Sequence, residues 1–229
     1  MPKVVDHAER RGEILEATWR VIARLGLEGT TTREIAREAN CSTGVLAHYF
    51  KNKDEILRLA LDYAHERIRL RILALRERFT GVELLRAVLA ELVPLDYQRQ
   101  IEMTLEISFW GRAVAHTRLR ALQHNDVELW HARLRGLLEE CVASGQLPED
   151  LDPEESAAAL VCFTDGLGLN AYLYPERYSA VRVEALLDRQ LALLGADLSS
   201  TRRLIRHPRP AGTKPAGRRP SDSTSGVTP

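Results

Sequence analysis

Long apolar runs are missing from this sequence. No stretch approaches the roughly 18 to 20 residues that a helix needs to cross a bilayer, although hydrophobic residues make up 45% of the 229 positions and suffice for a buried core. The opening stretch MPKVVDHAERRGEILEATW also lacks the apolar region and the small-residue cleavage site of a secretory signal. These absences argue against a membrane or secreted protein, and we expect a globular protein of the cytoplasm.

Cysteine is scarce, and the short motifs of common enzymes are absent. The three cysteines, Cys41, Cys141 and Cys162, lie far apart, which suits small buried hydrophobes better than a disulfide framework or a zinc site. The sequence has no phosphate loop, zinc His/Cys cluster, G-x-S-x-G elbow or dinucleotide fingerprint. We therefore predict that the protein is not an enzyme and holds no cofactor or metal.

One enzymatic alternative is a metal-binding helical bundle. Glu128 and His131 form a Glu-x-x-His pair, the spacing that puts a carboxylate and an imidazole on one helix face in di-iron sites. Such a site needs a second pair of this kind and two further glutamates. The sequence offers only Asp62 with His65 as a similar pair, so the set is incomplete.

The net charge of zero conceals an uneven distribution along the chain. Residues 1–60 hold ten Lys or Arg and nine Asp or Glu, residues 61–200 hold fifteen and twenty-two, and residues 201–229 hold seven and one. The last segment is rich in Pro, Gly, Ser and Arg and has almost no apolar residues, so we expect a disordered basic tail. Such a tail serves either as a solubilising extension or as a charge-based contact to nucleic acid.

Ahead of this tail, apolar residues recur at spacings of three and four, and β-branched alternation is nearly absent. The sequence therefore predicts an all-α protein. The first helix is expected from about Ala8 to Leu25 and ends at Gly26. Its buried face should carry Ile14, Ala17, Val21 and Leu25.

Two short capped helices follow. Thr31 begins a helix over 32–39, and Ser42 begins a second helix over 43–49. Asn40 tolerates the left-handed backbone that the tight turn between them needs. A long helix should then start after Asn52. Two short helices joined in this way predict a helix-turn-helix, whose second helix enters the major groove of DNA.

The second short helix carries side chains suited to a groove. Gly44 allows close backbone approach, Val45 and Ala47 can contact thymine methyl groups, and Thr43 can bond to a base edge or a phosphate. Phosphates are within reach of His48, Tyr49, Lys51 and Lys53. The alternative is a generic helical hairpin, because capped short helices occur in many all-α proteins.

The stretch TTREIAREANCSTGVLAHYFKNKDEIL resembles the TetR family of transcriptional regulators. It contains T-x-x-x-I-A-x-x-A followed by S-x-G-x-x-x-x-[HY]-F-x-x-K, which fixes many positions in one register. The resemblance implies that Ser42 begins the recognition helix and that members contact DNA at the positions of Thr32, Arg33, Thr43, Gly44, His48, Tyr49 and Lys53. Ala47 departs from the pattern, since many members have an aromatic residue there that touches a phosphate. STGVLAHYF, EISFW and FTDGLGLNAYL look like the branch that includes the choline-responsive regulator of betaine synthesis, but no ligand is carried over from them.

The remaining helical part predicts a second domain with a subunit interface. The segment DYQRQIEMTLEISFWGRAVAH should form a helix that is buried nearly all round. A later helix, AAALVCFTDGLGLNAYLY, is apolar on every side, and Gly166 and Gly168 allow another helix to approach closely. With SAVRVEALLDRQLALLG it predicts a four-helix interface in a homodimer, which the resemblance also implies. Two recognition helices can then read the half-sites of a near-palindromic operator.

Aromatic and polar residues of this second domain predict a small-molecule pocket, although any single aromatic can simply fill the core. The candidates are Met103, Glu106, Phe109, Trp110, His116, Trp130, Phe163, Asp165, Asn170 and Tyr172. Asp165 on an apolar helix needs either a structural partner or a ligand. Trp110 lies one turn from Glu106, and an indole beside a carboxylate favours an organic cation or a cationic amphiphile. In the alternative, Glu106 pairs with Arg112 or another arginine, and the pocket takes a neutral lipophile.

The sequence thus predicts three segments: a helix-turn-helix DNA-binding domain over 1–60, a helical ligand-binding and dimerisation domain over 61–200, and a basic tail over 201–229. We expect a DNA-binding repressor that a small molecule releases from its operator.

Overall fold

The computed structural model describes residues 7–115 and 117–199, and all regular structure in these ranges is helical. The helices are α1 (His7–Gly29), α2 (Thr32–Glu38), α3 (Thr43–Tyr49), α4 (Lys53–Arg76), α5 (Gly81–Glu91), α6 (Tyr97–Ala115), α7 (Thr117–Ala143), α8 (Pro153–Leu173) and α9 (Ala180–Leu193). The predicted all-α fold is confirmed. The predicted basic tail and His116 lie outside the described residues.

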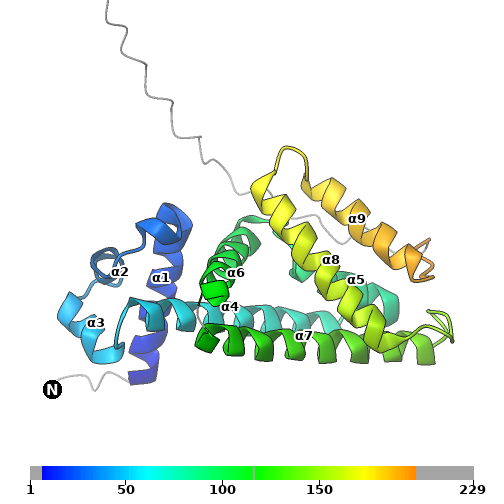
Figure 1. Cartoon of the computed structure of the whole chain (residues 1–229), viewed down its shortest axis with the longest axis horizontal. Coiled ribbons are helices and arrows are strands. Elements are labelled where there is room, and N and C mark those ends of the chain that lie inside the picture. Colours follow the sequence, from blue (N-terminus) through cyan, green and yellow to red (C-terminus); the bar gives the residue numbers. More distant parts are fainter. Residues whose placement is uncertain (1–6, 116, 200–229) are drawn as a thin grey trace, which may run out of the picture.

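Two groups of helices are joined by α4 (Figure 1). Helices α1, α2 and α3 gather at one end of the molecule, and α5 to α9 form the larger body at the other. The long helices α4 and α7 both extend along this body, where α4 packs on α5 and α6, and α7 packs on α5, α6 and α8. No helix in the described ranges is long and apolar enough to cross a membrane.

Capping side chains set the predicted helix starts. The Thr31 hydroxyl accepts a hydrogen bond from the backbone N–H of Glu34 at 3.2 Å, and Asn52 Oδ1 accepts one from Glu55 at 2.9 Å. The carboxylate of Asp152 accepts from the first-turn amides of α8 at 2.9 and 3.2 Å. Each bond satisfies a donor that a helix start leaves without a backbone partner, which typically contributes about 1 kcal/mol.

The end of α1 differs in part from the prediction. Gly26 has φ 67 and ψ 178, so the regular helix breaks there as expected. Ile14, Ala17 and Val21 are fully buried, but Leu25 is 41% exposed. The prediction that Leu25 shares the buried face is wrong, because this residue lies at the last position before the break and no neighbouring helix covers it.

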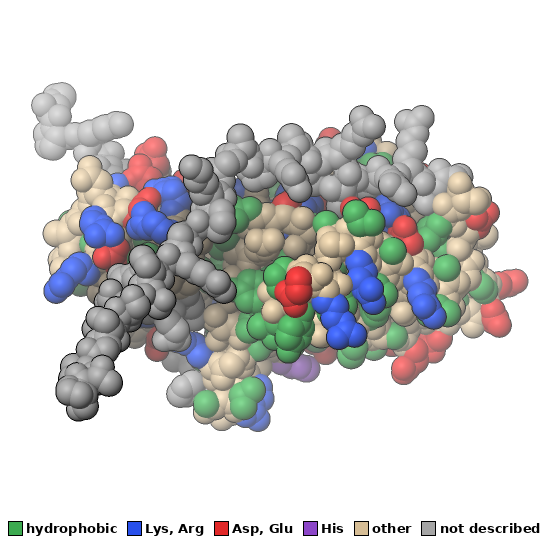
Figure 2. Space-filling model, turned by 90° about the horizontal axis from the view of Figure 1, so that it is seen from above, with side chains coloured by type: hydrophobic (Ala, Val, Ile, Leu, Met, Phe, Trp, Pro, Cys, Tyr) green, Lys and Arg blue, Asp and Glu red, His purple; other side chains and the backbone are tan. Residues whose placement is uncertain are grey.

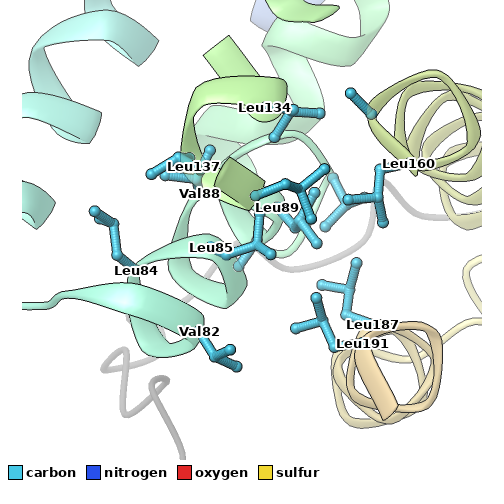
Figure 3. Packing of buried hydrophobic residues seen from close by; sticks show 14 of the residues in the cluster. Val82, Leu84, Leu85, Val88, Leu89, Leu134, Leu137, Leu160, Leu187 and Leu191 are labelled. Carbon is cyan, nitrogen blue, oxygen red and sulfur yellow. The ribbon is translucent and has the colours of Figure 1, made fainter. Parts of the chain in front are cut away.

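The main core lies among α5, α7, α8 and α9. Figure 3 shows Leu187 and Leu191 of α9 pointing toward Leu85 and Leu89 of α5, with Leu160 of α8 beside them. All five side chains are at most 1% exposed. Full burial of each contributes roughly 1.5–3 kcal/mol to folding, so this cluster holds the larger body together.

Helix α8 crosses close to α6 at Gly168, as predicted, whereas a Cβ on Gly166, the other predicted contact, would meet no atom within 4 Å. A Cβ atom on Gly168 would lie 2.5 Å from the Met103 methyl group of α6. Only glycine fits there without a shift of Met103.

The middle of α6 is well buried, but Val114 near its end is 76% exposed. The expectation that this helix is buried nearly all round is therefore wrong at its C-terminal turn, which extends beyond its neighbours.

One side of the α8–α9 pair stays exposed within the single chain. Figure 2 looks down on the side where α8 and α9 lie in Figure 1, and hydrophobic side chains gather on it. The exposed positions recur at spacings of three, four or seven residues, as they do on one face of a helix. They are Ala159, Cys162, Gly166 and Leu173 on α8, and Val181, Ala185 and Ala192 on α9.

Candidate DNA-binding face and ligand cavity

The turn between α2 and α3 has the geometry that its sequence predicts. Asn40 adopts φ 49, the left-handed conformation that asparagine tolerates better than most residues. Ser42 then caps α3 by accepting a hydrogen bond from the Val45 amide at 3.2 Å. An Arg10 guanidinium N–H of α1 donates to the Ala39 carbonyl at 3.0 Å and so holds the turn against the first helix.

Apolar residues fix the two short helices from beneath. Ile35 of α2, Leu46 of α3 and Phe50 are at most 3% exposed and pack with Ile14 of α1 and Ile56 of α4. Because Leu46 is the only buried residue of α3, the rest of that helix is available for contacts outside the protein.

The predicted DNA-binding residues lie on and beside the uncovered side of α3. Thr32, Arg33, Ser42, Thr43, Gly44, Val45, Ala47 and His48 are exposed, and Tyr49 and Lys53 are half-buried. Among them, Thr32 and Arg33 come from the first turn of α2, and Lys53 from the first turn of α4. The fold therefore gathers three helix starts around the recognition helix, and helix N-termini favour negatively charged groups such as phosphates.

His7 joins this face although the sequence did not single it out. Its ring centroid lies 5.2 Å from that of Tyr49 and 5.7 Å from that of His48. The start of α1 therefore packs against the end of the recognition helix. Periodicity does not reveal such a contact, because it depends on how the two helices cross.

A cavity opens in the larger body, among residues of α4, α6, α7, α8 and the segment that ends α5. It encloses about 710 Å³ of empty space, part of which is open solvent. The lining residues are His65, Ile68, Glu91, Leu92, Val93, Arg99, Glu102, Met103, Glu106, Trp110, Gln123, Asp126, Val127, Trp130, Val161, Thr164 and Asp165.

Half of the predicted ligand-binding residues line this cavity: Met103, Glu106, Trp110, Trp130 and Asp165. The other described candidates lie elsewhere. Phe109 is buried in the cluster that joins α1, α4 and α6, and Phe163 packs against the main core. The amide of Asn170 donates to the Gly166 carbonyl at 2.7 Å, and the Tyr172 hydroxyl lies 3.0 Å from that of Thr104.

His65 and Glu106 connect the cavity to α4. His65 Nε2 is hydrogen-bonded to Glu106 Oε1, and its Nδ1 lies 3.9 Å from Asp126 Oδ2. Burial lowers the pKa of His65, but the hydrogen bond and charge of Glu106, with Asp126 and Asp62, outweigh burial and leave the pKa above its ordinary value. The predicted alternative of a Glu106–Arg112 pair is wrong, because Arg112 donates to Asp54 at 2.6 Å instead.

Two other acids of the cavity are neutralised by arginines. Glu91 and Glu102 are 7% and 4% exposed. Arg71 of α4 donates to both at 2.5 to 2.8 Å, and Arg99 of α6 donates to Glu91 as well. Burial raises the pKa of Glu102, while the bonds from Arg71 oppose that rise. Removal of one partner of such a buried pair typically costs 3–5 kcal/mol, so this network is structural.

Asp165 has no such partner. Its carboxylate forms no hydrogen bond or ion pair with the described residues, although the residue lines the cavity. Asp165 is exposed in the single chain, yet desolvation by the atoms around its carboxyl, together with the charge of Glu106, raises its pKa to about 6. The predicted structural partner is therefore not found within one chain, and the role as a ligand contact stays a prediction.

A further cluster connects the cavity helix α6 to the DNA-binding end. Trp19 of α1 and Leu57 and Leu61 of α4 pack against Leu105 and Phe109 of α6. The pair formed by Arg112 and Asp54 adds a polar contact between the end of α6 and the first turn of α4. Helix α6 therefore both lines the cavity and packs against α4, the helix that follows the recognition helix.

The sequence did not predict Gln123, Asp126 or the arginine–glutamate network as parts of this site, and it offered His65 only as part of a metal pair. A usable signal existed for the network, since Glu91, Arg99 and Glu102 interrupt otherwise apolar helix faces, where a charged residue needs a partner. The structure gives no support to a metal site at Glu128 and His131. Among residues 7–115 and 117–199 no three His, Cys, Asp or Glu side chains gather closely enough to hold a metal ion.

Comparisons with known proteins agree with this architecture. Residues 14–60 match the profile of bacterial regulatory proteins of the tetR family, and residues 81–196 match the C-terminal profile of BetI-type transcriptional repressors. The regulator PksA of Bacillus subtilis is 33% identical over 189 residues, which cover 82% of this chain and 90% of PksA. A BetI regulator of Burkholderia cenocepacia is 30% identical over 178 residues, covering 76% of this chain and 87% of BetI.

Solved structures show the same fold. A transcriptional regulator from Rhodococcus sp. Rha1 has a TM-score of 0.69 and 28% identity, covering 82% of this chain and 97% of the other. A regulator from Saccharomonospora viridis, solved in complex with choline, has a TM-score of 0.74 and 23% identity, covering 81% and 96%. With its helix-turn-helix and its BetI-type C-terminal domain, the chain belongs to the TetR family of ligand-responsive, DNA-binding transcriptional repressors.

Proposed function

We propose that the protein is a homodimer whose two α3 helices bind the half-sites of a near-palindromic operator, and that a cationic or amphipathic small molecule in the cavity releases it. The residues that line the cavity are the observation that supports this class of ligand. None of the described arginines pairs with Glu106, Asp126 or Asp165, and Trp110 and Trp130 line the same space.

The charge balance of the cavity supports a cation. Glu91 and Glu102 are offset by Arg71 and Arg99, so they add no net charge. Among the described residues, the side chain near Glu106, Asp126 and Asp165 that can carry a positive charge is His65, whose pKa is raised. An indole face beside an acidic group attracts an organic ammonium by about 2 kcal/mol or more when desolvated. The choline in the structure from Saccharomonospora viridis is a ligand of this class.

The DNA side of the proposal rests on the exposed face of α3. Thr43 and Val45 are assigned to base edges, and Tyr49, His48 and Lys53 to phosphates. In this division residues 1–60 are the DNA-binding domain and residues 61–200 bind the ligand and form the dimer. Half-sites about one turn of DNA apart, roughly 34 Å, would admit both recognition helices to the major groove.

The uncovered stripes of α8 and α9 support the dimer. Their small and apolar residues form a face that water would otherwise contact, and two copies of the pair would bury it as a four-helix interface.

Helix α4 supplies the mechanism by which the ligand would release the DNA. A ligand that favours one tilt of α4 through its contacts at His65 would change the separation of the two α3 helices.

The test uses intrinsic fluorescence, because two of the three tryptophans line the cavity. The purified dimer is titrated with choline and with its neutral carbon analogue, 3,3-dimethyl-1-butanol, first alone and then bound to a DNA selected from a random pool. We expect choline to bind and to release the DNA, and the neutral analogue to bind at least about tenfold more weakly.

Two variants separate the contribution of the Glu106 charge from that of the Trp110 stacking surface. Glu106→Gln should weaken choline binding and Trp110→Leu should abolish it. If Glu106→Gln binds as tightly as the wild type while Trp110→Leu does not, or if the neutral analogue matches choline, the cation assignment is wrong and the cavity takes a neutral ligand.

A further inference from the structure

Two buried oxygen atoms of the cavity have no hydrogen-bond donor. They are Oε2 of Glu106 on α6 and Oε1 of Gln123 on α7, and both residues line the cavity. Buried acceptors are nearly always paired in native proteins, because an unpaired one loses its bonds to water without compensation. Two such atoms in one cavity wall therefore indicate that something outside the described residues completes them.

The donors near these atoms are already engaged. His65 Nε2 is taken by the other oxygen of Glu106, and His65 Nδ1 faces Asp126. The Thr164 hydroxyl donates within its own helix, where the Leu160 and Val161 carbonyls lie at 2.9 and 3.0 Å. Asp126 and Asp165 only accept when they are charged. The indole N–H groups of Trp110 and Trp130 also line the cavity, but no donor of the described residues bonds to either oxygen.

We propose that the ligand carries an O–H or N–H donor in addition to its positive charge, and that Gln123 selects it by accepting this hydrogen bond. This inference rests on the proposed function, since it describes the same ligand more closely. The charge lies beside Glu106 Oε2, and the donor reaches Gln123 Oε1. A hydroxylated ammonium meets both conditions, and so does a protonated amine with N–H groups at its charged nitrogen.

The chemistry separates this ligand class from two others. A quaternary ammonium with only hydrocarbon substituents supplies the charge but leaves Gln123 unpaired. A neutral alcohol supplies the donor but leaves Glu106 without a countercharge. Sites built to hydrogen-bond a ligand reject an analogue that lacks the group, because their own buried polar atoms are then left unpaired.

The binding test compares choline with ethyltrimethylammonium, which has the same charge and nearly the same shape but no hydroxyl. On the wild-type protein we expect choline to bind about tenfold more tightly. On Gln123→Leu this preference should fall below about twofold, because the acceptor that reads the hydroxyl is gone. Gln100→Leu is the matched control, since Gln100 is exposed on α6 and outside the cavity lining, and it should keep the wild-type preference.

These outcomes separate the two ideas. Equal binding of choline and ethyltrimethylammonium overturns the role of Gln123 and leaves the cation proposal intact. Binding of 3,3-dimethyl-1-butanol as tightly as choline overturns the cation proposal. A preference for choline that persists in Gln123→Leu shows that another acceptor reads the hydroxyl and removes Gln123 from this role.

A second measurement needs no ligand and decides the case if none of these compounds binds. If Gln123 Oε1 has no partner in the free protein, Gln123→Leu should raise the thermal unfolding midpoint by about 2–4 °C. Gln100→Leu makes the same chemical change at an exposed site and should shift the midpoint by less than about 1 °C. A lower midpoint for Gln123→Leu shows that this acceptor is satisfied without ligand, and the inference fails.

Discussion

At the residue scale, the acids of the cavity fall into two classes by their partners. Glu91 and Glu102 are held by Arg71 and Arg99 in a buried network, so their charges are fixed parts of the fold. Glu106 and Asp165 have no arginine, and the pKa of Asp165 rises to about 6 through desolvation and the nearby Glu106 charge. Carboxylates of the second class are those that a bound cation can influence.

Cation binding should depend on pH in a defined direction. The pKa of His65 is raised by Glu106 of α6, Asp126 of α7 and Asp62 of its own helix, and Asp165 faces Glu106 with its own pKa near 6. Lower pH therefore protonates both groups, which makes the cavity less negative. We expect choline affinity to increase as pH rises from 5 to 7.5, measured by tryptophan fluorescence.

The control for this pH dependence is Asp165→Asn, which removes one of the two titrating groups. Its affinity should change less between pH 5 and 7.5 than that of the wild type. An affinity that falls as pH rises would contradict the sign, because it would mean that the bound ligand favours the protonated cavity.

The recognition helix gives a second prediction at this scale. Lys53→Ala should weaken binding to all DNA sequences and reduce the salt slope of the affinity by about one, since one phosphate contact is lost. Arg78→Ala removes the same charge from an exposed residue just beyond α4, far from α3 in sequence, and should leave the slope unchanged. Equal slopes for wild type and Lys53→Ala would show that Lys53 does not contact a phosphate.

Residues that act through local backbone geometry were predictable from the sequence, whereas residues that act through helix crossing were not. Thr31, Ser42 and Asn52 cap helices within three residues of themselves, so their spacing alone reveals them. His65 and Glu106 are 41 positions apart, and their contact depends on how α4 and α6 pack. Spacing within one helix carries no information about that contact.

At the element scale, the sequence pattern predicted where helices start better than it predicted which helix faces are buried. α3 spans 43–49 as expected, and α4 begins at Lys53. The helix over 153–173 is apolar on every side and was predicted to form a subunit interface, and one stripe of it is exposed in the single chain. A sequence shows that a face is apolar, but it does not distinguish burial in the chain from burial in a dimer.

This stripe yields a test of the proposed dimer. Gly166 lies in its middle, and a Cβ there would meet no atom within 4 Å in the single chain. Gly166→Glu should therefore leave the fold intact but place a charge in the four-helix interface, where an unpaired charge is costly. Sedimentation velocity should show a shift from dimer to monomer at micromolar concentration.

Gly111→Glu is the matched control for this experiment. Gly111 is exposed on α6 and has no atom within 4 Å of an added Cβ, so this variant should sediment like the wild type. A Gly166→Glu protein that remains dimeric would place the interface elsewhere on the molecule.

At the scale of the whole molecule, α6 is the element that connects ligand and DNA. Its C-terminal half carries Glu106 and Trp110 in the cavity and, two residues after Trp110, Arg112, which pairs with Asp54 of α4. On the same turns Leu105 and Phe109 pack against α1 and α4. A shift of α6 on ligand binding therefore reaches the DNA-binding end through one apolar cluster and one ion pair.

The last prediction concerns this coupling. Arg112→Gln removes the ion pair to Asp54 at the first turn of α4, while neither residue lines the cavity that holds Glu106. We expect the variant to bind choline and operator DNA separately within about twofold of the wild type, because an exposed ion pair contributes at most about 1 kcal/mol. Saturating choline should nevertheless weaken its DNA binding less than in the wild type. Reciprocity requires DNA to weaken choline binding by the same reduced factor, so both titrations must agree.

Arg76→Gln is the control, because it breaks a comparable pair with Glu140 of α7 at the end of α4 away from α3, and it should leave the coupling unchanged. Equal coupling in Arg112→Gln and wild type would mean that the apolar cluster around Phe109 transmits the signal without the ion pair.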